Sequence, residues 1–323
     1  MEEFIIKDKN ISKGELISLF NTQYKKDLII LLKKIDDIIK NAEKNYGYIY
    51  FDKENKSKLL IYRFDKIIPL KNMIKINEQY FYNASFIPTQ YYNYYASHCP
   101  IYNFDRKLDS LLFIQMLYDN DINIVSIPAN LCDICDDGKS YQWFPDKKLE
   151  TITYTSKNNN INFTLKCINI KYIDYGYEKI KIVKLDLINN ITKNNKDLII
   201  YQYINWLDRD FPKNQNLLIK YIKLIYNNLK TIDNKKILIH CSAGIGRTGT
   251  VICALELFNY INDNFININS LVKFKKISDK NLIELFNFII NKINFLRDFR
   301  PMMVEDPKQF LGLINLCKFF YSL

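Results

Sequence analysis

Apolar side chains recur at helical spacing near the start of the chain. Leu16 and Leu19 open a series that continues at intervals of three and four positions to residue 39, which places one apolar face along a helix. Ser12 and Glu15 have the spacing of a capping box, in which each side chain bonds a free backbone N–H at the helix start. The pattern predicts a helix over residues 12–45.

The middle of the chain changes to the two-residue period of strands. The segments 151–156, 161–173 and 178–188 alternate apolar with polar positions, are rich in β-branched residues and are separated by Asn-rich turns, which is typical of antiparallel strands. Two mostly apolar runs without such a period, Ile122–Ile127 and Lys236–His240, predict short strands buried on both faces.

Further periodic segments complete an α/β pattern. Strand-like runs lie between residues 58 and 101, and helices are expected at 108–118, 214–231, 248–262, 279–299 and 306–321. Neither an internal repeat nor a Pro/Gly/Ser-rich linker divides the chain. We therefore expect a single α/β domain, with a central twisted mixed β-sheet flanked by α-helices, over residues 51–323. Residues 1–50 are expected to form a helical extension packed on it.

Composition and charge favour a globular protein of a reducing compartment. The 323 residues are 48% hydrophobic and 25% charged, and the net charge is +11, but the lysines are scattered, so nucleic-acid binding is not expected. Seven cysteines at irregular spacing, with no secretory signal at Met1, favour a cytoplasmic location. The lack of an apolar run of roughly 18 residues predicts that no segment spans a membrane. We expect a soluble monomer.

One stretch carries most of the chemistry. His240 and Cys241 end the second buried strand, and the Ser-Ala-Gly-Ile-Gly sequence at 242–246 leads to Arg247 and Thr248 at a predicted helix start. Backbone N–H groups there lack helical partners and attract anions. The substrate-binding candidates of this loop are Ser242, Ala243, Gly244, Ile245 and Gly246, whose glycines let successive N–H groups turn inward.

Arg247 and Cys241 complete a predicted phosphoryl-transfer site. Arg247 lies six residues after Cys241, and its planar guanidinium matches two phosphate oxygens. The same positive field lowers the pKa of a thiol, so Cys241 should be a thiolate nucleophile. The Thr248 hydroxyl could hydrogen-bond its sulfur. No Gly-Lys-Ser/Thr follows the glycines, which excludes a Walker A loop, and His98 is the only histidine besides His240, which argues against a cysteine protease.

This loop resembles that of the tyrosine-specific protein tyrosine phosphatases, His-Cys-Ser-Ala-Gly-x-Gly-Arg-Ser/Thr-Gly. Trp206-Leu207-Asp208, 33 residues before Cys241, resembles the mobile Trp-Pro-Asp loop of that family, with leucine in place of proline. The resemblance implies the cysteine-phosphatase fold and makes Asp208 the general acid and base. Asp210 is a second candidate for that role.

Other blocks of the chain resemble the same family in the same order. Phe81-Tyr82-Asn83-Ala84-Ser85 is similar to its Tyr-Ile-Asn-Ala-Ser core block. Tyr62-Arg63-Phe64-Asp65 stands where the family has a tyrosine that stacks on the substrate ring and an aspartate that grips the substrate backbone. Phe64 and Asp65 are therefore substrate-binding candidates, although Phe64 is equally compatible with a core aromatic residue.

The C-terminal block departs from the family at a catalytic position. Leu296 through Val304 matches it closely, and Gln309 matches its later glutamine, but Glu305 replaces a glutamine that positions the hydrolytic water. A carboxylate there should slow hydrolysis or weaken phosphate binding. The pair Cys132 and Cys135 has metal-ligand spacing, but a structural zinc site needs four ligands and no second pair accompanies it.

Together these features predict an enzyme that hydrolyses phosphotyrosine in proteins through a cysteinyl phosphate, without a metal or cofactor. Its partners would be tyrosine-phosphorylated proteins, in the cytoplasm of the organism or of a host cell if the source is a virus. The alternative is a catalytically weak pseudophosphatase that binds and traps phosphotyrosine, because Leu207 and Glu305 alter the hydrolytic half of the site. A phosphoinositide phosphatase is disfavoured because residues 242–246 include no lysine.

Overall fold

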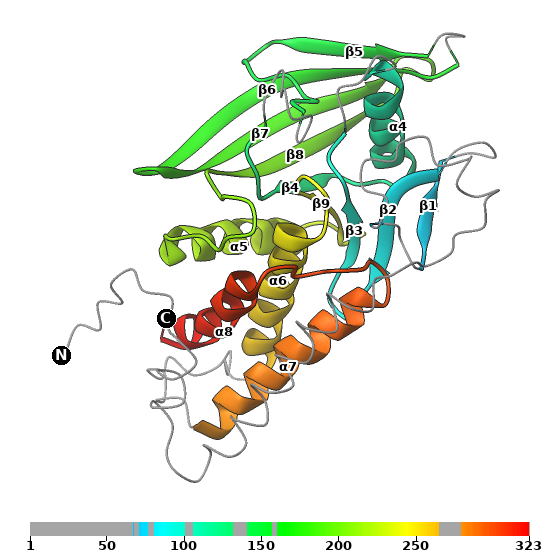
Figure 1. Cartoon of the computed structure of the whole chain (residues 1–323). Coiled ribbons are helices and arrows are strands. Elements are labelled where there is room, and N and C mark those ends of the chain that lie inside the picture. The colour runs from blue at the N-terminus through cyan, green and yellow to red at the C-terminus, as the bar shows by residue number, and fades with distance from the viewer. Residues whose placement is uncertain are drawn as a thin grey trace.

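The computed structural model describes residues 67, 71–76, 81–100, 106–131, 141–156, 160–264 and 279–322. Within these ranges a mixed sheet of nine strands is flanked by five helices (Figure 1). The predicted α/β class is confirmed. The helix predicted at 12–45 lies outside the described residues. None of the described helices is both long and apolar enough to cross a bilayer.

The sheet has the strand order β1-β2-β3-β9-β4-β8-β7-β6-β5. Its strands are β1 (Met73–Lys75), β2 (Phe81–Pro88), β3 (Asn93–Ser97), β4 (Ile124–Ile127), β5 (Thr151–Thr155), β6 (Asn162–Tyr175), β7 (Glu178–Asn189), β8 (Asn195–Ile204) and β9 (Lys236–His240). The four central strands β3, β9, β4 and β8 are parallel to one another, and the remaining pairs are antiparallel.

The helices cover both faces of this sheet. They are α4 (Arg106–Asp119), α5 (Gln215–Leu229), α6 (Gly246–Asn264), α7 (Asp279–Arg297) and α8 (Pro307–Ser322). Figure 1 shows α4 on one side and α5 to α8 on the other. Strand β9 contributes side chains to the hydrophobic core on both faces of the sheet. Ile237 and Ile239 pack in the core that α5 to α8 cover, whereas Leu238 packs in the core that α4 covers.

Within the described residues, the predicted elements are confirmed within a few residues, with one omission. Strand β8 was not expected, although it pairs with β4 on one side and with β7 on the other. Its central residues are buried on both faces, so Leu198 to Tyr203 lack the alternation that marked β6 and β7, and Gln202 interrupts the apolar run.

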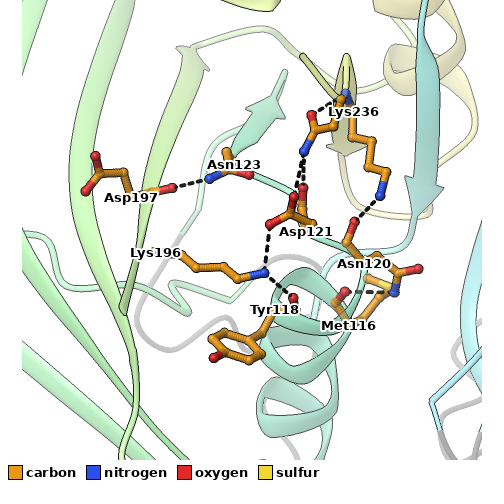
Figure 2. A network of polar contacts seen from close by, with 9 residues as sticks. Met116, Tyr118, Asn120, Asp121, Asn123, Lys196, Asp197 and Lys236 are labelled. Atoms are coloured by element: carbon orange, nitrogen blue, oxygen red, sulfur yellow. Dashed lines mark hydrogen bonds and ion pairs between the residues drawn. The ribbon is translucent and has the colours of Figure 1, made fainter. Parts of the chain in front are cut away.

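Parallel pairing brings the carboxyl ends of β3, β9, β4 and β8 to one edge of the sheet. At the opposite edge, polar contacts join the amino ends of β8 and β9 to the segment that leads into β4 (Figure 2). The Lys196 Nζ donates to Asp121 at 2.7 Å and to the Tyr118 carbonyl at 2.9 Å, and the Lys236 Nζ donates to the Asn120 carbonyl at 2.8 Å. The carboxyl edge is the usual place for a ligand in such a sheet.

Candidate active site

The loop from Cys241 to Ile245 joins the carboxyl end of β9 to the start of α6. Gly244 has a φ of +73°, and a Cβ atom at this position would collide with the backbone carbonyl of Ser97 at the end of β3. Only glycine satisfies both conditions. The Cys99 N–H also donates to the Ser242 carbonyl at 3.0 Å. The loop is thus fixed against the neighbouring parallel strand.

A buried arginine holds the loop from behind. Arg300 is fully buried and donates from Nε to the Gly244 carbonyl at 2.7 Å, from Nη2 to the Ala243 carbonyl at 2.8 Å, and from Nη1 to Asn83 Oδ1 at 2.8 Å. Two loop carbonyls are therefore drawn toward Arg300. Because the C=O and N–H of a trans peptide point in opposite directions, the N–H groups of Gly244 and Ile245 point away from Arg300, near the positive end of α6.

Cys241 is 3% exposed and lies at this positive end. Burial alone would raise the pKa of its thiol, but the Arg247 charge, the Thr248 hydroxyl and backbone N–H groups outweigh that effect, so the pKa is lowered from its ordinary value. At any given pH, Cys241 is therefore more often a thiolate than an ordinary cysteine is.

The preceding residue, His240, is neutral. Burial lowers its pKa to about 4. Its Nε2 accepts a hydrogen bond from Trp143 Nε1 at 3.1 Å, so the proton lies on Nδ1, which is 3.2 Å from the Cys241 carbonyl. This histidine therefore helps to fix the backbone of Cys241 and supplies no charge.

Arg247, in the first turn of α6, reaches the segment that carries Asp208. Its Nη1 donates to the Trp206 carbonyl at 3.0 Å, and its Nη2 lies 2.8 Å from Asp208 Oδ1. Among the described residues, its buried Nε has no hydrogen-bond partner. A buried guanidinium donor without an acceptor is rare in proteins, and here it suits an anionic ligand.

The loop that carries Asp208 is anchored at both ends. The indole of Trp206 is buried and donates to the Asp210 carbonyl at 2.8 Å. Asn205 adopts a φ of +67°, and its backbone N–H donates to Asn130 Oδ1 at 2.7 Å. These contacts define a short loop, residues 206–210, which we call the acid loop.

The two acidic candidates of the acid loop have different surroundings. Asp208 faces Arg247, whereas Asp210 Oδ1 accepts from the Phe211 N–H at 3.0 Å and lies 3.6 Å from Lys308 Nζ. Asp208 is therefore the candidate that contacts Arg247. Leu207, which replaces the family's proline, is 48% exposed and packs into no core.

Glu305 and Gln309 reach the same end of α6. A Cβ atom at Gly246 would stand 2.9 Å from both terminal atoms of the Gln309 side chain and 3.0 Å from Glu305 Oε2. Gln309 Oε1 accepts from the Glu305 N–H at 3.1 Å. Burial raises the pKa of Glu305; Arg209, 3.2 Å away, opposes that shift, and Asp208 adds to it.

Most predicted site residues are brought together here. The loop and the first turn of α6 contain Cys241, Ser242, Ala243, Gly244, Ile245, Gly246, Arg247 and Thr248. Asp208, Glu305 and Gln309 lie against them. Phe64, Asp65 and the Cys132–Cys135 pair lie outside the described residues. The sequence did not single out Arg209, whose only signal was a positive charge beside Asp208.

Comparison with known proteins gives one consistent family. The family model described as protein-tyrosine phosphatase matches residues 52–318. The chain is 24% identical over 304 residues to tyrosine-protein phosphatase 1 of Schizosaccharomyces pombe, covering 91% of this chain and 50% of that protein. It is 23% identical over 264 residues to the human receptor-type tyrosine-protein phosphatase eta, covering 79% and 17%. The chain thus spans half or less of these relatives.

Proposed function

The chain belongs to the protein-tyrosine phosphatase family, and we propose that it hydrolyses phosphotyrosine in proteins through a cysteinyl-phosphate intermediate. The observation that carries this proposal is the Cys241 thiol, whose pKa is lowered at the start of α6, with Arg247 and its unpartnered Nε beside it. A thiolate next to a phosphate-binding guanidinium is arranged for attack on phosphorus.

In the first step the Cys241 sulfur forms a bond to phosphorus while the bond from phosphorus to the tyrosine oxygen breaks. The loop N–H groups and Arg247 stabilise the charge on the phosphoryl oxygens. Asp208 donates a proton to the leaving oxygen. The 2.8 Å distance to Arg247 supports the location that this role needs, because the carboxyl group lies next to the group that would bind phosphate.

In the second step water attacks the phosphorus and the bond to sulfur breaks. Asp208 accepts the proton of the water, and Cys241 leaves as a thiolate. The Thr248 hydroxyl and the Arg247 charge, which lower the pKa of Cys241, also make the sulfur a better leaving group. Glu305 would accept a hydrogen bond from the attacking water, and the bond from the Glu305 N–H to Gln309 Oε1 would support it in that position.

Selectivity for phosphotyrosine rests on the upstream segment. We propose that Phe64 stacks on the substrate ring, because a phenyl face provides the same contact as the family's tyrosine. Asp65 would then bind the backbone of the substrate. The partners of the chain would be tyrosine-phosphorylated proteins.

A second candidate function is a phosphotyrosine trap with poor turnover, which the carboxylate of Glu305 near the start of α6 favours. Hydrolysis of an aryl phosphate, with and without a chelator, separates the two. The enzyme should turn over without change in chelator, and Cys241→Ser should abolish turnover while it retains phosphopeptide binding. A wild-type protein that binds phosphotyrosine peptides yet releases no phosphate would refute hydrolysis and support the trap.

A further inference from the structure

Three consecutive residues of the acid loop each form an ion pair with a different segment. Asp208 pairs with Arg247 of α6 at 2.8 Å, Arg209 pairs with Glu305 at 3.2 Å, and Asp210 lies 3.6 Å from Lys308 of α8. The charges along the loop alternate in sign and each meets its opposite. The acid loop is therefore held by charge to α6 and to the segment that begins α8.

The pair between Arg209 and Glu305 offsets the negative charge that Glu305 brings close to the proposed phosphate site. Its side chain is 17% exposed, and its Oε2 points at Gly246, at the helix end that would bind a phosphate. A partly buried carboxylate at this position repels a phosphate dianion. The other charged groups that act on Glu305 include Asp208 and Asp306, which add negative charge. Among the described residues that act on the pKa of Glu305, Arg209 is the cation that opposes them.

The backbone at Arg209 makes this residue an unusual choice. Its φ is +52°, in the left-handed region that disfavours side chains with a Cβ atom. The side chain is 69% exposed, so core packing does not explain its presence. What distinguishes Arg209 is its guanidinium group, which is directed at Glu305. Arg209 is also the residue next to Asp208, the proposed acid.

We propose that Arg209 is a positioning residue that neutralises Glu305 when the acid loop lies over the site. This inference rests on the proposed hydrolysis, because it lets Glu305 orient the attacking water without weakening the binding of phosphate. Arg209 and Asp208 are adjacent, so they move together. The charge compensation is therefore present only when the acid is in place, and movement of the loop away from α8 would leave Glu305 free to repel the product phosphate.

The test is a double-mutant cycle with inorganic phosphate as the probe. Arg209→Gln should weaken phosphate binding, measured by calorimetry, by roughly fivefold, the upper range for a largely exposed pair. Arg209→Lys should keep the phosphate affinity within about twofold of wild type. The lysine retains the positive charge, and the altered geometry of an exposed ion pair changes the binding free energy only slightly. Arg209→Gln combined with Glu305→Gln should restore the affinity of Glu305→Gln alone. Lys220→Gln, an exposed change on α5, controls for the loss of one positive charge.

Two results would overturn the inference. One is an Arg209→Gln protein whose phosphate affinity equals that of Lys220→Gln. The other is a double variant as weak as Arg209→Gln, which would mean that Arg209 acts on the loop and not through Glu305. Turnover of an aryl phosphate is measured in parallel. A wild-type protein without turnover would refute the proposed hydrolysis, while the calorimetric cycle would still decide whether Arg209 compensates Glu305.

Discussion

Replacing Arg300 by lysine should uncouple the phosphate-binding loop from the core while the charge is retained. The guanidinium is fully buried and serves three acceptors in three directions, the carbonyls of Gly244 and Ala243 and Asn83 Oδ1, at 2.7 to 2.8 Å. Burial lowers the pKa of Arg300 to about 10, so it is charged at neutral pH. A lysine ammonium ends a narrower side chain and lacks the planar fork of arginine.

The expected loss follows from the acceptors. We expect an ammonium to reach one of the three, which leaves two buried oxygens without a donor. Each such group costs about 1–3 kcal/mol, so the free energy of unfolding should fall by about 2–6 kcal/mol, out of a total of about 5–15 kcal/mol for a typical domain. Phosphate affinity should fall as well, because the carbonyls of residues 243 and 244 would no longer be held away from the ligand.

The assay is urea unfolding, followed by calorimetric titration with phosphate. Arg297→Lys is the matched control, because Arg297 donates to the carbonyls of Met303 and Val304 but is only half-buried, so that water can replace lost bonds. Its cost should stay near 1 kcal/mol. The reasoning fails if Arg300→Lys destabilises the protein no more than this control does, or if it leaves phosphate affinity unchanged.

Three further predictions concern the same site. Because the pKa of His240 is low in the folded chain, the unfolded chain binds one more proton between about pH 6.5 and 4. The free energy of unfolding should therefore be complete above that window and fall by about 2 kcal/mol from about pH 7 to 5. In urea unfolding, His240→Gln should lack this fall, and an equal fall in the variant would mean that another group causes it. Asp208→Asn should lower kcat for an aryl phosphate with a poor leaving group by on the order of 10²–10⁴, and an unchanged kcat would transfer the acid role to Asp210. Gly244→Ala should abolish phosphate binding, because the added methyl group collides with the Ser97 backbone. Gly176→Ala is the control: its φ is also positive, at +68°, but the space around it is open, so it should cost only about 1 kcal/mol in thermal unfolding. Equal effects of the two variants would contradict the close approach of the loop to β3.

Local pattern predicted much of this architecture, because buried strands and amphipathic helices leave a period in the sequence. The Cys241–Arg247 loop was predictable for the same reason, since its strand, glycines and arginine are contiguous. Strand β8 was not, because burial on both faces removes the alternation of Leu198 to Tyr203. The pairing of Arg209 with Glu305 was also beyond local reasoning, since it joins residues 96 positions apart. The roles of Phe64 and Asp65 stay predictions.

The reach of Arg300 across the chain has a consequence for synthesis on the ribosome. The residue that orients the carbonyls of the loop is translated 59 residues after Cys241, while Asn83, its third acceptor, precedes it by 217. At about 5–20 residues per second, roughly 3–12 s separate the cysteine from its arginine. During that interval the nascent chain contains Cys241, the proposed nucleophile, but not Arg300, which orients the carbonyls of its loop. Catalytic competence should therefore appear only late in translation, so a ribosome stalled before Arg300 would display an inactive thiol.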